Sequence, residues 1–147
     1  MIYDRLIELG YTPVFLMFST AGTENQNDAL YIQKVMLGKT YNRTQTIEQT
    51  LSVYPSLYAV VGMRLHAGIL ACVHEIPYIS ISYGPKTDDL ISTLGIEYLA
   101  LGSKDITMES FEWSWQSLTT NYESEKANMR DKHISIREEL IRNLRNI

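Results

Sequence analysis

The chain has 147 residues, of which 45% are hydrophobic and 20% charged, and its formal net charge is −4. This length fits one domain of ordinary size, and the composition excludes a disordered or fibrous protein. The acidic balance argues against a nucleic-acid partner, because clusters of Lys and Arg hold phosphate backbones. No apolar run approaches the roughly 20 residues that span a bilayer, and the N-terminus lacks a signal-peptide pattern, so we expect a cytoplasmic protein.

The cysteine and histidine content predicts neither a disulfide nor a metal site. Cys72 is the only cysteine and lies in an apolar stretch, which indicates a small core residue in a reducing compartment. His74 is interpreted as a residue at a helix C-terminus, and His133 as part of a solvated helix face. Neither has the neighbours that a zinc site needs.

The first third of the chain alternates between helical and extended patterns. The loop over residues 19–27 is polar, and Thr23 or Asn25 is expected to cap the helix that follows it. The predicted elements are a helix over 2–10, a buried strand over 13–18, a helix through Ala29, Ile32 and Met36 that ends at Gly38, an extended piece over 40–42, and a helix over 46–53 that ends before Pro55.

The middle of the chain continues this alternation, and its end does not. The predicted elements are a strand over 57–61, a helix over 65–73, a strand over 78–83, a helix over 85–94 that ends at Gly95, and a strand over 98–101. Residues 103–147 contain neither Gly nor Pro and are rich in charge, which predicts one or two long helices. Met129, Ile136 and Leu140 are expected to pack back on the domain.

Strands that alternate with helices through short links indicate βαβ units with a parallel sheet. We therefore predict a single α/β domain over residues 1–147, a Rossmann-like three-layer sandwich with a long helical C-terminal tail. In such sheets ligands bind beyond the carboxyl ends of the strands.

Two segments carry a resemblance to a known family. They read Val-Gly-Met-Arg-Leu-His-Ala-Gly-Ile-Leu-Ala over residues 61–71 and Ile-Pro-Tyr-Ile-Ser-Ile-Ser-Tyr-Gly-Pro-Lys over residues 76–86. The pattern resembles the polysaccharide pyruvyl transferase family, in which a strand ending in Gly-Met-Arg-Leu-His is followed by a helix, a Pro, a second strand and Tyr-Asp-Pro-Lys. Weaker likeness extends over nearly the whole chain.

The resemblance implies an activity and an architecture. The chain is similar to the C-terminal, donor-binding half of a two-domain enzyme with a GT-B-type fold, with the family's N-terminal half absent. The implied reaction transfers the pyruvyl group of phosphoenolpyruvate onto two hydroxyls of a sugar as a cyclic ketal, with no cofactor. The implied partners are phosphoenolpyruvate, a saccharide or lipid-linked sugar acceptor, and either the missing N-terminal domain or a second copy in a homodimer. We expect the isolated chain to be inactive.

Three residues are the first candidates for the site. Arg64 and Lys86 each follow a predicted strand and stand at a helix start, where free N–H groups and the helix dipole favour an anion. The planar guanidinium of Arg64 suits bidentate capture of carboxylate or phosphate. An imidazole can donate a proton, and His66 is the candidate catalytic acid that protonates the methylene carbon of phosphoenolpyruvate.

Further candidates have a weaker basis. The resemblance places Leu65 and Tyr83 in the substrate-binding site beside Arg64 and Lys86, although Tyr83 also suits a core position. Asn25 and Asp28 follow the strand over 13–18 and are second-tier substrate-binding candidates. Gly84 stands where the family has Asp, and we expect it to loosen the turn that aims Lys86.

Two other functions compete with this interpretation. The first is a nucleotide-sugar glycosyltransferase or epimerase domain, which the lack of a convincing ribose-binding carboxylate after the strand over 78–83 disfavours. The second is a non-catalytic anion-binding or oligomerisation module, which the absence of the N-terminal half favours.

Overall fold

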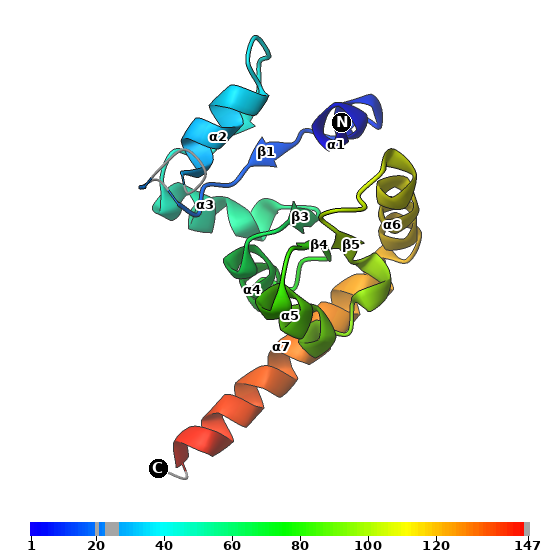
Figure 1. The fold of residues 1–147 in the computed structure, drawn as a ribbon. Coiled ribbons are helices and arrows are strands. Elements are labelled where there is room, and N and C mark those ends of the chain that lie inside the picture. Colours follow the sequence, from blue (N-terminus) through cyan, green and yellow to red (C-terminus); the bar gives the residue numbers. More distant parts are fainter. Residues whose placement is uncertain (20, 23–26, 146–147) are drawn as a thin grey trace. The chain divides into compact units, whose positions relative to one another are not determined.

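The computed structural model describes residues 1–19, 21–22 and 27–145 (Figure 1). The chain divides into two compact units, Met1–Pro55 and Ser56–Ile147. Helices and strands alternate in both units, and every strand pair is parallel among the residues described. The predicted α/β class with parallel sheets is therefore confirmed, and the arrangement is compatible with a Rossmann-like fold.

The first unit holds a short two-stranded sheet and three helices in its described part. Its elements are α1 (Ile2–Glu8), β1 (Val14–Phe15), α2 (Asp28–Val35), β2 (Asn42–Arg43) and α3 (Ile47–Val53), and the 3-10 helix η1 (Tyr54–Ser56) follows at the boundary with the second unit. β1 pairs with β2 in parallel, with Val14 opposite Asn42. β1 is shorter than the predicted strand over 13–18, and both of its residues are only half-buried.

The core of the first unit forms as the helical spacing predicts. Met17, Ile32 and Met36 are buried together, and Phe15 packs against them. The cap of α2 differs from the prediction, because the Asn27 side chain accepts hydrogen bonds from the backbone N–H groups of the first turn. An Asx residue directly before the helix is best placed to reach those groups. The predicted cap residues Thr23 and Asn25 lie outside the described residues.

A buried pair of threonines ties the chain after β1 to β2 and α3. The Thr44 Oγ1 accepts from the Met17 N–H at 2.9 Å, and the Thr50 hydroxyl donates to the Met17 carbonyl at 2.9 Å. The two hydroxyl oxygens lie 2.6 Å apart. Because the Thr50 proton goes to the carbonyl, the Thr44 hydroxyl is left to donate to the Thr50 oxygen or to the Phe15 carbonyl at 3.5 Å. Both backbone groups of Met17 are thus satisfied by side chains in a buried site.

The second unit contains a three-stranded parallel sheet. Its elements are β3 (Val60–Gly62), α4 (Leu65–Val73), β4 (Tyr78–Ser82), α5 (Pro85–Leu94), the 3-10 helix η2 (Glu97–Leu99), β5 (Leu101–Gly102), α6 (Met108–Thr120) and α7 (Tyr122–Arg145). The strand order is β3-β4-β5. Val60 lies opposite Tyr78, and Ile81 lies opposite Leu101. The helices over 65–73 and 85–94 begin and end as predicted, and Gly95 closes α5 in the left-handed conformation.

The predicted strand over 98–101 is wrong for most of its length. Tyr98 belongs to η2, and the strand begins only at Leu101. The Tyr98 hydroxyl donates to the Glu125 carboxylate at 2.6 Å, and Glu125 is buried in α7. This bond joins residues far apart in the sequence, and burial raises the pKa of the Tyr98 hydroxyl above its usual range. A tertiary contact therefore overrides the local strand preference.

The two long helices of the tail are confirmed, and their packing is partly as expected. Met129 is buried against α4, where the Cys72 thiol faces its carbonyl, and burial raises the pKa of that thiol. Ile136 is half-buried, but Leu140 is 58% exposed because α7 runs past the end of α4 (Figure 1). No described helix is both long and apolar enough to cross a membrane.

The two histidines outside the candidate site are both placed by the structure. His74 is the C-cap of α4, as predicted. His133 is half-buried rather than on a solvated face, and its Nδ1 lies 3.8 Å from the Glu75 carboxylate, within ion-pair range but not within hydrogen-bonding range. The side chain therefore packs over the turn that follows α4.

Gly68 allows α4 to lie close to the sheet and to α5. A Cβ at this position would meet the Tyr78 ring at 2.6 Å and the Leu90 side chain at 2.7 Å. The Tyr78 ring has little freedom to move away, because it is buried and its hydroxyl donates to the Gly62 carbonyl at 2.7 Å. The distance between α4 and β4 thus depends on the missing side chain.

The threonine pair predicts a stability effect confined to the first unit. Thr50→Val keeps the shape but removes the hydroxyl that donates to the buried Met17 carbonyl, so we expect a loss of about 1–3 kcal/mol of unfolding free energy. Thr50→Ser retains the hydroxyl and should lose less. Both tryptophans lie in the second unit, so unfolding is followed by far-UV circular dichroism and by hydrogen exchange of the Met17 amide. Equal stability of the Val and Ser variants would contradict this role of the hydroxyl.

The close approach at Gly68 predicts an effect in the second unit. Gly68→Ala gains helix propensity, but the new methyl group overlaps a fixed ring, so we expect a net loss of about 1–2 kcal/mol. Gly102→Ala is the matched control, since a Cβ there makes only an ordinary contact at 3.6 Å. Urea unfolding followed by tryptophan fluorescence reports the second unit. A Gly68→Ala variant as stable as the control would show that α4 shifts freely.

Candidate anion-binding site

The carboxyl ends of β3 and β4 lie at the same edge of the sheet. The two strands are neighbours and parallel, with Gly62 opposite Ser80. A link of two residues connects each strand to its helix, α4 after β3 and α5 after β4. The starts of α4 and α5 therefore share one sheet edge, as the sequence predicts.

The segment Arg64–His66 forms the start of α4. Arg64 is the N-cap residue, with extended backbone, and its side chain makes no capping hydrogen bond. Arg64 and Leu65 are half-buried, and His66 is exposed in the first turn. The first N–H groups of α4 therefore receive no cap from the Arg64 side chain, while a guanidinium and an imidazole stand beside them.

The start of α5 has the same character. Gly84 is its N-cap and has no side chain to offer, and Pro85 is the first helical residue. Lys86 is exposed in the first turn, and Tyr83 is 59% exposed just before it. Tyr83 is therefore not a core residue, which removes one of the two interpretations of its sequence position.

The turn between β4 and α5 is held by Thr87, which is buried. Its Oγ1 accepts from the N–H groups of Tyr83 at 3.2 Å and Gly84 at 3.3 Å, and its hydroxyl donates to the Gly84 carbonyl at 2.7 Å. The Ser82 hydroxyl donates to the Asp88 carboxylate and lies 3.1 Å from the Thr87 oxygen. These hydroxyl bonds hold the backbone on both sides of Gly84, and the expectation that Gly84 loosens this turn stays a prediction.

The two second-tier residues lie in the other unit. The Asp28 Oδ2 accepts from the backbone N–H groups of Phe18 at 2.8 Å and Ser19 at 2.9 Å, so this carboxylate shapes the chain that follows β1. Asn25 lies outside the described residues. Substrate binding by Asn25 and Asp28 stays a prediction.

The structure adds one cation that sequence reasoning passed over. Lys104 is exposed and follows β5, which ends at Gly102. Because β5 pairs in parallel with β4, Lys104 belongs to the same sheet edge as Lys86. The sequence alone could have indicated this residue, because Lys104 lies just beyond the predicted strand over 98–101.

These features suit an anionic ligand. Positive groups follow three neighbouring strands, and two helices begin there at residues that make no side-chain cap. By contrast, α6 starts with a closed capping box in which Thr107 and Ser110 bond each other's N–H groups at 3.1 and 3.0 Å. Among the described residues, no cluster of three His, Cys, Asp or Glu side chains forms a metal site. The chemistry on offer is that of cations, backbone donors and one imidazole.

Comparison with known proteins identifies the family. The family model for polysaccharide pyruvyl transferase matches residues 1–85, which is more than half of the chain. The matched part covers all of the first unit and includes Arg64, Leu65, His66 and Tyr83, and it ends one residue before Lys86. Neither a curated protein nor a solved structure matches the chain. The chain belongs to the polysaccharide pyruvyl transferase family.

Proposed function

We propose that this chain is the donor-binding part of a polysaccharide pyruvyl transferase and that the carboxyl edge of β3 and β4 binds phosphoenolpyruvate. The observation that carries the proposal is the pairing of two helix starts without a side-chain cap, each beside a cation, at one sheet edge. Phosphoenolpyruvate bears a phosphate and a carboxylate, so its site needs both cations and backbone donors at close range.

The residues divide the work by their chemistry. Arg64 offers a planar fork for the carboxylate or the phosphate, and Lys86 offers a point charge for the phosphate. The N–H groups of α4 and α5 complete the cradle, with Leu65 and Tyr83 alongside. Lys104 adds positive potential at the same edge.

His66 supplies the acid for the first step. It donates a proton to the methylene carbon of phosphoenolpyruvate, which becomes a methyl group and leaves the neighbouring carbon electrophilic. One sugar hydroxyl attacks that carbon and loses its proton. The second hydroxyl then takes the place of the phosphate, whose bond to carbon breaks, and it too loses its proton. The product is a cyclic ketal, and inorganic phosphate is released.

The proposed architecture is the C-terminal half of a GT-B-type enzyme. In that arrangement a second domain closes over the sheet edge and holds the acceptor hydroxyls against the pyruvyl carbon. The exposure of His66, Lys86 and Tyr83 is compatible with a second domain that covers this edge. The same exposure also fits a non-catalytic anion-binding module, which is the second candidate function. Turnover separates the two.

The proposal predicts which side chains hold the donor. Arg64→Ala and Lys86→Ala should each weaken binding of phosphoenolpyruvate roughly tenfold, because each removes a charged hydrogen-bond donor. Affinity of the unaltered chain should be low, since the open edge leaves these cations in water. Titration calorimetry measures the affinities. Arg142→Ala is the control, because this exposed residue lies near the end of α7. Equal affinity in all variants would refute the assignment.

The role of His66 is tested in the same way and then by turnover. His66→Ala should keep the affinity for phosphoenolpyruvate, because proton delivery acts only in the transition state. When the chain is joined to the family's other half, phosphate release with a saccharide acceptor should disappear in this variant. Undiminished release would remove His66 from the mechanism, and no release from the unaltered protein would favour the binding module.

Gly84 stands where the family has Asp, and we expect that restoring Asp at this position stabilises the chain. Gly84 has an extended backbone, and a Cβ added to it would meet no atom within 4 Å. Gly84→Asp should therefore fit, cap α5 and raise the unfolding free energy by about 0.5 kcal/mol. Gly84→Asn is the control that caps without adding charge. Thermal unfolding compares the variants, and a loss of stability in both would show that the turn rejects a side chain.

A further inference from the structure

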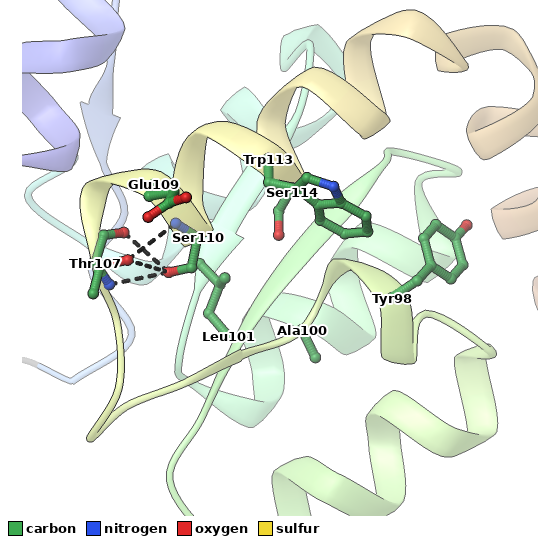
Figure 2. A pocket seen from close by; sticks show the side chains of 8 residues that line it. All are labelled: Tyr98, Ala100, Leu101, Thr107, Glu109, Ser110, Trp113 and Ser114. Carbon is green, nitrogen blue, oxygen red and sulfur yellow. Dashed lines mark hydrogen bonds between the residues drawn. The ribbon is translucent and has the colours of Figure 1, made fainter.

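A second site of different chemistry lies in the second unit, between α6 and the segment formed by η2 and β5. It is an open cavity of about 380 Å³ that faces solvent over much of its extent (Figure 2). This volume lies within the range of about 300–1,000 Å³ that small-ligand pockets show. Tyr98 and Ala100 form one wall, and Ser110, Trp113 and Ser114 of α6 form the other.

Two polar side chains of α6, those of Glu109 and Ser114, line this cavity. Ser114 is only 1% exposed, and Figure 2 shows its oxygen directed away from α6 toward Ala100. Within the part of the chain that the structure describes, neither the Ser114 hydroxyl nor the Glu109 carboxylate has a hydrogen-bond partner. The Ser114 hydroxyl lines the cavity, so a ligand in the cavity can exchange a hydrogen bond with it.

The cavity also offers aromatic surface. Trp113 is 58% exposed, and its indole extends from α6 over the cavity toward the η2 segment (Figure 2). The Tyr98 hydroxyl already donates to Glu125, so Tyr98 presents its ring rather than a free hydroxyl. An exposed indole beside a cavity offers a flat apolar surface on which a ligand can stack.

The charges of the lining restrict the ligand class. Among the described residues that line the cavity none is basic, and Glu109 is the one charged side chain. The bonds between Thr107 and Ser110 use two N–H groups at the start of α6, and Glu109 adds a negative charge to its first turn. The cavity therefore disfavours phosphates and carboxylates. It favours a neutral molecule with several hydroxyls and an apolar C–H face that stacks on the indole, which is the chemistry of a sugar ring.

We propose that this cavity is a saccharide subsite that holds a neutral sugar unit of the acceptor. Thr107, at one end of the cavity, follows β5 at the sheet edge that carries the candidate donor site, so a polymer lying in the cavity has its next units near that edge. The acceptor role rests on the proposed function. The saccharide binding itself rests on the lining of the cavity.

The test uses nuclear magnetic resonance on the full chain. Methyl glycosides of glucose, galactose, mannose and N-acetylglucosamine are titrated while the two indole N–H signals are followed. We expect at least one sugar to shift the Trp113 signal saturably at millimolar concentration. The Trp115 signal should change little, because Trp115 is only 8% exposed. Trp113→Ala should weaken the affinity roughly tenfold, and Ser114→Ala by a smaller factor.

The controls separate this proposal from the donor site. Tyr31→Ala removes an aromatic ring of similar exposure, 55% against 58%, from α2 and should leave the affinity unchanged. Arg64→Ala should also leave sugar binding unchanged, whereas it weakens phosphoenolpyruvate binding. If the donor site does not exist, phosphoenolpyruvate will not shift the signals of residues near Arg64. Three results would overturn the saccharide subsite. The first is that no sugar shifts the Trp113 signal. The second is that the Trp113→Ala variant binds sugar with unchanged affinity, as measured from the shift of the Ser114 backbone N–H signal, and the third is that adenosine binds the cavity and no sugar does.

Discussion

The parallel pairing of β3 with β4 is the constraint on which the candidate site depends. Because both strands run the same way and each leads into its helix through two residues, α4 and α5 must start at one edge. The pairing is supported from the side by Tyr78, whose ring fills the space that Gly68 leaves and whose hydroxyl reaches the Gly62 carbonyl. The Tyr78 side chain, at the start of β4, thus fixes the end of β3 and the distance between α4 and the sheet. The positions of the cations follow from that arrangement.

Much of this arrangement is accessible from the sequence, where local signals agree with the tertiary structure. Gly84, Pro85 and Gly95 mark the limits of α5 through backbone chemistry that does not depend on neighbours. The segment at Tyr98 shows the opposite case, since its aromatic and aliphatic residues suit a strand but its hydroxyl bonds to Glu125 of α7. Leu140 has the spacing of a packed residue, yet α4 ends before it. Long-range contacts of this kind leave no trace in a single sequence.

The two candidate sites also differ in how far the sequence alone predicts them. The positions of Arg64 and Lys86 can be predicted because their place beside strand ends is a local property, and Lys104 shares that property. The cavity is not predictable from pattern. Trp113 and Trp115 are two residues apart in one helix, and only the packing of α6 shows that one ring is buried and the other exposed. Ser114 lies between them, and only the structure shows that its side chain lines a cavity together with Ala100.

The three helix starts that follow β3, β4 and β5 differ in one physical respect that organises the second unit. α4 and α5 begin with Arg64 and Gly84, which make no side-chain cap, and a cation stands beside each start. α6 begins with reciprocal bonds between Thr107 and Ser110 and carries Glu109 in its first turn, where a carboxylate offsets the positive end of the helix dipole. The start of α6 thus carries a carboxylate where the start of α4 carries a guanidinium, while the first turn of α5 holds both Lys86 and Asp88. Under the proposed assignments, the phosphate of the donor is favoured beside Arg64, and an uncharged sugar unit is not repelled by the Glu109 carboxylate.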